Sequence, residues 1–202
     1  YNTAIGSQAG VNISTGDYNV AVGYLAQGSG TAQTGSYNIA VGDSAAKRLT
    51  SGDGNITIGS AAGFYINSAD YNTAIGHTAL GANNVAVGKD AMGANTTATG
   101  NTAVGYFAMR DTTTGSANTY IGYGAGAENE TGNTNTFVGS SAGGESMGSI
   151  NTYVGAQCGQ GAAGGGNTGD HNTGMGYYSM GFTNLTSGSE NACFGRSAGG
   201  GL

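Results

Sequence analysis

The chain has 202 residues, with 42 glycines, no proline or tryptophan, and 8% charged residues, where soluble globular domains carry about 25%. This composition excludes an ordinary globular domain, and the net charge of only −6 argues against a disordered chain. Five residues are Lys or Arg, so nucleic acid and anionic membranes are disfavoured as partners. No apolar run approaches the ~18 residues of a membrane-spanning helix, so we expect no membrane insertion in this segment.

A motif exemplified by N-T-A-V-G-Y-F-A at residues 101–108 is repeated along the chain in twelve copies. Every copy has Asn at its first position, an apolar residue at the fourth and Gly at the fifth, and ten copies have Ala at the eighth. A period near 17 residues indicates a solenoid, and we number positions within each copy from its Asn. The copies begin at Asn2, Asn19, Asn38, Asn55, Asn72, Asn84, Asn101, Asn118, Asn135, Asn151, Asn172 and Asn191.

Each position of the motif has a physical interpretation. The second to fourth positions are mostly β-branched or apolar and predict a short strand. The small eighth residue suits a narrow interior, and the Asn column predicts a ladder of side chains that satisfies backbone groups. The Gly column suits a sharp corner that needs a positive φ. The corner glycines are Gly6, Gly23, Gly42, Gly59, Gly76, Gly88, Gly105, Gly122, Gly139, Gly155, Gly176 and Gly195.

The predicted fold is an all-β parallel β-solenoid, or β-roll, with one coil for each copy of the motif. We expect two short strands and two turns in each coil. With a rise of ~4.8 Å per coil, the stack would form a rod on the order of 60 Å long. Because so narrow a coil encloses little apolar volume, we expect the rod to associate with other subunits along its length.

We interpret residues 1–202 as a single repeat array within a longer fibre chain. Two extra residues occur in Gln27–Tyr37, and the short gap from Asn72 to Asn84 predicts a bend or a change of register. The segment 159–171 is rich in Gly and Ala, so we predict a loop insertion there. The last two copies are degenerate and suggest a transition to another domain.

Two sets of aromatic residues are candidates for contacts outside the coil. The third position is Ala in six of the first seven copies and then becomes Tyr120, Phe137 and Tyr153 in consecutive copies. Since a sealed interior would not take Ala and Tyr alternately, we predict that these three residues lie at a subunit interface, with exposure to solvent as the alternative. The sixth and seventh positions vary most, which indicates exposure, and tyrosines there are candidates for contacting sugars or proteins. These tyrosines are Tyr24, Tyr106, Tyr123 and Tyr177.

No residue cluster points to catalysis or to a cofactor. His77 and His171 occupy different positions and have no Cys or carboxylate at ligand spacing, so we expect no metal site. Cys158 and Cys193 also occupy different positions and are expected to be buried thiols rather than a disulfide. Four aspartates share a turn position before the Asn, where we expect them to cap turns, with weak calcium binding as an alternative. They are Asp17, Asp53, Asp70 and Asp170.

The string N-T-A-I-G-S-Q-A at residues 2–9, with its relatives N-V-A-V-G and N-T-A-V-G, resembles the head repeats of trimeric autotransporter adhesins. Those repeats carry S-V-A-I-G-type strings. Similar strings led by Asn are found in bacteriophage tail-fibre and tail-spike proteins. The resemblance covers essentially the whole chain and implies a parallel β-roll in a homotrimer, located extracellularly or on a virion surface. This chain departs from the adhesin pattern in its longer period and in having Asn where those repeats often have Ser.

We therefore expect a structural, non-enzymatic rod segment of an attachment fibre, in a phage tail fibre or a bacterial surface adhesin. Its exposed side chains would add weak multivalent contacts to a cell-surface glycan or protein receptor. The main alternative is a subunit of a secreted extracellular filament. An ice- or carbohydrate-binding solenoid is a further alternative, because Thr fills the second position in five consecutive copies, from Thr102 to Thr173. A polysaccharide-degrading β-helix enzyme is disfavoured, because the acidic residues are scattered along the sequence.

Overall fold

The computed structural model describes residues 1–28, 30–79, 83–161, 167–181 and 187–199. The chain forms two compact units, Tyr1–Ala91 and Met92–Leu202. Each unit is a parallel β-solenoid, so the predicted all-β class and solenoid architecture are confirmed. No helix occurs within these described ranges.

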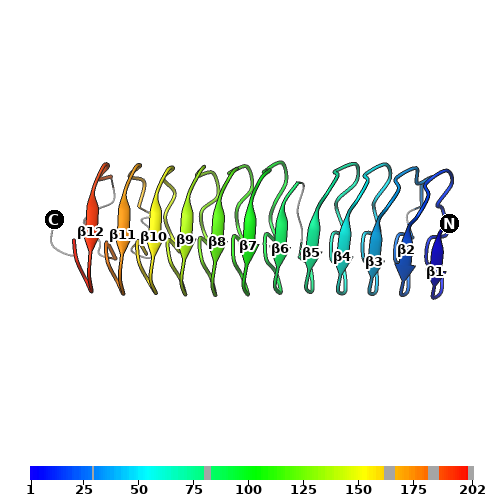
Figure 1. Ribbon diagram of the computed structural model, residues 1–202, viewed down its shortest axis with the longest axis horizontal. Helices are drawn as coiled ribbons and strands as arrows, with labels where there is room; N and C mark the ends of the chain where they lie inside the picture. Colours follow the sequence, from blue (N-terminus) through cyan, green and yellow to red (C-terminus); the bar gives the residue numbers. More distant parts are fainter. Residues whose placement is uncertain (29, 80–82, 162–166, 182–186, 200–202) are drawn as a thin grey trace. The chain divides into compact units, whose positions relative to one another are not determined.

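Each copy of the motif forms one strand of three residues at its second to fourth positions (Figure 1). Within each unit, strands that follow one another in the chain pair in parallel, with equal motif positions aligned. The first unit contains β1 (Thr3–Ile5), β2 (Val20–Val22), β3 (Ile39–Val41), β4 (Ile56–Ile58), β5 (Thr73–Ile75) and β6 (Val85–Val87). The second contains β7 (Thr102–Val104), β8 (Thr119–Ile121), β9 (Thr136–Val138), β10 (Thr152–Val154), β11 (Thr173–Met175) and β12 (Ala192–Phe194).

Two irregularities expected from the sequence fall partly outside the described residues. The short copy that begins at Asn72 contains residues 80–82, which are not described, but β5 and β6 still pair with equal positions aligned. The strand ladder therefore does not change register there. Within the predicted insertion 159–171, residues 162–166 are not described. Asn167 forms an isolated parallel bridge with Ser146, so the chain has rejoined the stack by that residue.

The remainder of each coil consists of turns, so the prediction of two strands per coil is wrong for the described residues. The seventh and ninth positions have left-handed φ values, such as +60° at Phe107 and +53° at Met109, and an extended strand cannot continue through them. The turns nevertheless bond from coil to coil. The N–H of Met109 donates to the carbonyl oxygen of Ala125 at 3.0 Å, and that of Gly126 donates to Ala142 at 2.9 Å. Stacked turns thus replace the second strand ladder.

The corner glycines are required by the backbone geometry. All twelve have positive φ, from +116° at Gly195 to +142° at Gly88. Neighbouring coils also approach closely at the corner, because a Cβ atom on Gly105 would lie 2.4 Å from the carbonyl oxygen of Gly122. A side chain would therefore be strained by the dihedral angle and would collide with the next coil.

The Asn column forms the predicted ladder within each unit. Asn118 is representative: its Oδ1 accepts the N–H of Asn135 at 2.8 Å, and its Nδ2 donates to the carbonyl oxygen of Gly132 at 2.8 Å. Equivalent pairs of bonds recur from coil to coil in both units. Most of these asparagines are almost fully buried, so the ladder satisfies backbone groups that water cannot reach.

In the coils of β7 to β10 the third and ninth positions share the interior space, and the sizes of their residues are complementary. Ala103 is followed by Met109 in its coil, whereas Tyr120 is followed by Gly126. A Cβ atom on Gly126 would lie 2.1 Å from the ring of Tyr120, and the two large side chains therefore exclude each other. Phe137 with Gly143 and Tyr153 with Gly159 repeat the same arrangement. A glycine at the ninth position is what makes room for an aromatic ring at the third.

The expectation that Tyr120, Phe137 and Tyr153 lie at a subunit interface is therefore wrong. All three are completely buried inside their own coils, with stacked rings whose centroids lie 4.5 and 5.1 Å apart. The buried hydroxyl groups have amide partners, because Asn135 Nδ2 lies 3.4 Å from the Tyr120 hydroxyl and Asn167 Nδ2 lies 3.2 Å from that of Tyr153. Burial raises the pKa of both tyrosines well above its usual value.

Candidate functional sites

The outer face of the strands carries exposed apolar side chains in each unit. Side chains at the third position point into the coil, and those at the second and fourth point outward. Most interior third- and eighth-position residues are Ala, whereas the outward fourth position is always a larger apolar residue. Six of these outward residues are more than one-third exposed: Ile5, Ile58, Ile75, Ile121, Met175 and Phe194.

The four tyrosines predicted to be exposed all lie on the surface. Tyr24, Tyr123 and Tyr177 are about half exposed, and Tyr106 is 38% exposed. The ring of Tyr106 packs against Phe107, with centroids 3.9 Å apart, so it has one covered face. The rings of Tyr123 and Tyr177 leave more surface for a ligand.

A second set of exposed tyrosines was missed by the sequence analysis. Tyr1, Tyr18 and Tyr37 each precede the Asn of their copy, and their rings stack with centroids 5.2 and 5.1 Å apart and nearly parallel planes. The ring of Tyr18 is stacked on both faces, and Tyr1 and Tyr37 each stack on it with one face. The sequence signal is the dipeptide Tyr-Asn, which opens four of the first five copies.

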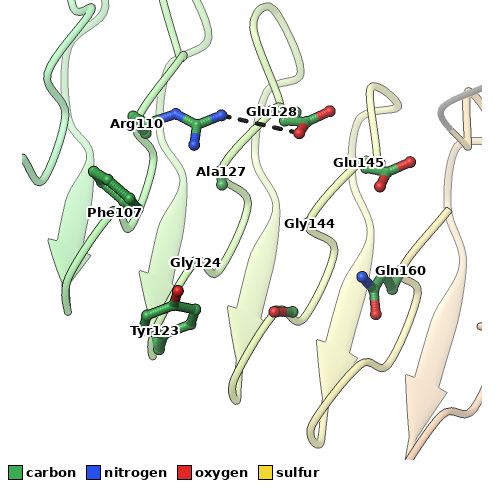
Figure 2. Close-up of a pocket in the computed structure, with 10 residues that line it drawn as sticks. Phe107, Arg110, Tyr123, Gly124, Ala127, Glu128, Gly144, Glu145 and Gln160 are labelled. Carbon is green, nitrogen blue, oxygen red and sulfur yellow. Dashed lines mark ion pairs between the residues drawn. The ribbon is translucent and has the colours of Figure 1, made fainter. Parts of the chain in front are cut away.

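The second unit carries a groove of about 230 Å³, which we call the acidic groove (Figure 2). It is hollow because Gly124 and Ala127 stand where the preceding coil has Phe107 and Arg110, and the next coil has Gly144 at the position of Ala127. Figure 2 shows Arg110, Glu128 and Glu145 in a row along successive coils. The groove is lined by Phe107, Arg110, Tyr123, Gly124, Ala127, Glu128, Ser141, Gly144, Glu145 and Gln160.

The eleventh position of three consecutive coils beside this groove is acidic, with Asp111, Glu128 and Glu145. Stacking of the coils therefore brings together acidic residues that appear scattered in the sequence. Arg110 forms a bidentate pair with Asp111, with Nε 2.9 Å from Oδ1 and Nη2 2.6 Å from Oδ2, and its Nη2 lies 3.9 Å from Glu128 Oε1. The carboxylate of Asp111 raises the pKa of the Arg110 guanidinium. Glu145 has no cationic partner within the described residues, and its buried Oε2 makes no hydrogen bond there. Burial, and then the charge of Glu128, raise the pKa of Glu145.

The first unit carries a larger groove of about 690 Å³, which we call the basic groove. Lys47 Nζ lies 5.7 Å from the centroid of Phe64, and Arg48 Cζ lies 5.5 Å from that of Tyr65, so both cations rest on rings of the following coil. The Oγ1 of Thr50 donates to the carbonyl oxygen of Asn67 at 2.8 Å. The groove is lined by Gly30, Thr31, Lys47, Arg48, Thr50, Phe64 and Asn67.

Three of the four turn aspartates bond the coil that precedes theirs, whereas the carboxylate of Asp17 lies 3.8 Å from the N-terminal amino group. Asp53 Oδ1 accepts the N–H of Ser36 at 2.7 Å, and Asp70 Oδ1 accepts the N–H of Asp53 at 2.8 Å, so each carboxylate bonds the backbone of the preceding coil. Asp170 accepts the N–H of Ser149 in the same way. No group of three or more His, Cys, Asp or Glu residues in the described part is arranged to hold a metal ion.

The two cysteines are free and buried. Burial raises the pKa of the Cys158 thiol to about 11, so this thiol stays protonated at neutral pH and is a poor nucleophile. His77 and His171 lie on the surface at different parts of their coils, as their motif positions predict. His77 contacts Thr78 through its ring nitrogen Nδ1, at 3.2 Å.

Comparison with protein-family models, curated proteins and solved structures gives no match for this chain. Among the described residues, no helix has the length and apolar character needed to cross a bilayer. The class of protein is therefore defined by its fold, a parallel β-solenoid built from copies of an Asn-led motif.

Proposed function

We propose that this chain is a structural, non-enzymatic segment of an extracellular attachment fibre, of the kind found in phage tail fibres and bacterial surface adhesins. In this proposal the solenoid works as a homotrimer, packs through the outer faces of its strands, and carries side chains that contact a cell-surface receptor. The proposal rests on the distribution of apolar side chains, together with the resemblance of the motif to adhesin and tail-fibre repeats.

The apolar distribution is the observation that carries the proposal. A chain that folds and works as a monomer gains most from Ile and Val in its interior, because burying these side chains stabilises the fold by about 1.5–3 kcal/mol each. Here the described interior is mostly Ala, while Ile58 and Ile121 are 40% exposed on the strand face. The same outward position is apolar in every copy, so each unit presents a continuous apolar rank. Exposed apolar surface of this extent is typical of a face that another chain covers.

Sedimentation equilibrium of the chain tests the proposal directly. We expect a mass of three times 19.7 kDa for the unmodified chain. Ile58→Glu would place a charge on the strand face and should shift the mass toward the monomer. Ser60→Glu is the matched control, because Ser60 is exposed in the same coil at the variable sixth position and should leave the mass unchanged. Circular dichroism of both variants checks that the solenoid still forms.

Other outcomes favour the alternatives. Open-ended polymers of increasing mass would favour a subunit of an extracellular filament. A stable monomer would contradict the trimer and would leave the strand face free. In that case the half-buried Thr rank of the second unit, from Thr102 to Thr173, would be tested for binding to ice by thermal hysteresis.

A further inference from the structure

We propose that the basic groove of the first unit binds an acidic saccharide, with Lys47 and Arg48 contacting its carboxylate or sulfate groups. The inference adds a ligand class to the attachment role proposed above, and only its biological meaning depends on that role. The binding measurement below is independent of subunit mass, so either proposal can fail without the other.

The distribution of cations is the first line of support. The chain has five Lys and Arg residues against eleven Asp and Glu. Among the described residues, Lys89 and Arg110 pair with carboxylates and Arg196 does not. Lys47 and Arg48 are adjacent in sequence and have no carboxylate within ion-pair distance among the described residues. Two neighbouring cations thus remain uncompensated in an acidic protein, where attractive partners of opposite charge are abundant.

The way these cations are held is the second line of support. Each lies over an aromatic ring of the next coil, which orders the side chain through a cation–π contact. The guanidinium of Arg48 lies over Tyr65 and has no carboxylate partner among the described residues, so its N–H groups can donate to a carboxylate or a sulfate, and Arg favours a planar, bidentate contact of this kind. Lys47 adds a point charge beside it.

The shape of the groove favours a saccharide over a small free ion. Its volume of about 690 Å³ lies within the range of small-molecule sites, and three consecutive coils contribute to its lining. The two extra residues in Gln27–Tyr37 bring Gly30 and Thr31 to one side, and Phe64 and Asn67 come from the coil on the other side. Thr50 and Asn67 provide a hydroxyl and an amide at the edge of this site, which suit the hydroxyl groups of a sugar.

The charge of the lining distinguishes this groove from the acidic groove. No acidic residue is among the described residues that line the basic groove, whereas the acidic groove contains Glu128 and Glu145. An anionic ligand would meet the carboxylate of Glu145, which has no cationic partner among the described residues, in the acidic groove, and two cations without carboxylate partners in the basic one. The negative net charge of the chain does not oppose this, because charges beyond about 8 Å are largely screened at physiological ionic strength.

Saturation-transfer difference NMR on the full chain tests the inference with two matched pairs of probes. Sialyllactose is compared with lactose, and trigalacturonate with its methyl ester, so that each pair differs mainly in negative charge. We expect signals from at least one acidic probe, no signal from its neutral counterpart, and weakening as the salt concentration rises. Absence of signal from both acidic probes would overturn the inference, as would equal signals from the acidic and neutral members of a pair.

Variants locate the site. The double variant Lys47→Gln with Arg48→Gln should weaken binding at least about tenfold, the loss expected for hydrogen bonds to charged groups. Arg196→Gln is the matched control, because Arg196 also lies over an aromatic ring, at 5.8 Å from Tyr177, but outside the groove. Thermal unfolding of each variant checks that the fold is intact. Equal binding by the double variant and the unmodified chain would contradict the inference.

Two further binding measurements distinguish a saccharide ligand from other anions. Inorganic sulfate should compete only weakly, since it lacks the hydroxyl groups that the lining can bind. Vesicles with about one-fifth phosphatidylserine should not bind, because the groove is lined by only two cations and a stable electrostatic attachment to a membrane takes a larger basic cluster. Competition by sulfate as strong as that of the saccharide, or binding to vesicles that requires Lys47 and Arg48, would refute the assignment to a saccharide.

Discussion

The size complementarity between the third and ninth positions makes a quantitative prediction about the interior of the coil. In the coil of β8, Tyr120 fills the space left by Gly126, and in the coil of β7, Met109 fills the space left by Ala103. Converting the first arrangement into the second requires two substitutions, Tyr120→Ala and Gly126→Met. Each alone should be severely destabilising, and the two together should largely compensate.

The magnitudes follow from the local geometry. Tyr120→Ala removes a fully buried ring and leaves a cavity, which should lower the free energy of unfolding by about 4 kcal/mol. Gly126→Met places a Cβ where the structure has 2.1 Å to the Tyr120 ring, and overpacking together with a left-handed φ should cost about 3 kcal/mol or more. In the double variant the introduced Met side chain fills the cavity left by the Tyr120 ring, so neither the clash nor the cavity contributes to the loss of stability. About 1 kcal/mol remains for the left-handed φ and about 1 kcal/mol for the lost stacking with Phe137.

Urea unfolding followed by far-ultraviolet circular dichroism measures all three variants. We expect the double variant to be about 2 kcal/mol less stable than the unmodified chain, whereas simple addition of the single effects gives about 7 kcal/mol. Tyr123→Ala combined with Gly126→Met is the matched control, because Tyr123 is exposed in the same coil and its loss cannot relieve the clash. Additivity of Tyr120→Ala and Gly126→Met within about 0.5 kcal/mol would refute the idea that the two positions share one space.

Two further predictions concern polar groups. Asn135→Ala would leave a buried backbone N–H and a buried carbonyl oxygen unpaired, so it should lower the free energy of unfolding, measured in urea, by about 3 kcal/mol. The control Asn133→Ala removes a similar bond on the surface and should lower that free energy by about 1 kcal/mol or less. Equal losses of stability in the two variants would contradict the role of burial. Glu145→Gln should raise the Tm at about pH 7, because the pKa of Glu145 is raised in the folded state, so its ionisation destabilises the fold as the pH rises through that value. Below the usual pKa of 4.5 the carboxyl is protonated in both states, so the two melting curves should coincide at about pH 3.5, and a difference that persists there would refute this reasoning.

The stacking of the coils could be predicted from the sequence because few residue types fit the backbone geometry that the stack requires at the Gly and Asn positions. Gly105 is required by a positive φ and by the 2.4 Å approach of the next coil, and Asn118 bonds two backbone groups at once. Such positions tolerate almost no alternative, so they repeat and reveal the fold. The second strand was predicted wrongly because the turn residues also bond from coil to coil, and the left-handed dihedral angles at Phe107 and Met109 leave no distinct composition in the sequence.

The burial of Tyr120 could have been predicted, because its signal lies in the sequence. An aromatic residue at the third position is followed six residues later by glycine in three consecutive copies, as in Tyr120 and Gly126. Considered alone, the change from Ala to Tyr indicated an exposed or shared face. Considered with the ninth position, it indicates that in these three coils the two positions share one space, as a close-packed interior demands.

The grooves could not be predicted from a repeating pattern, because they lie where the pattern is absent. The side chains at the tenth and eleventh positions take no part in the Asn ladder or the Gly corner, so they are free of the constraints that act on those two columns. Arg48 in one unit and Glu145 in the other occupy the same motif position and give their grooves opposite charge. Because this position contributes no side chain to the ladder, its residue can change without loss of the stack. Binding specificity in such a solenoid is therefore expected at the variable turn positions, on coils whose invariant columns preserve the fold.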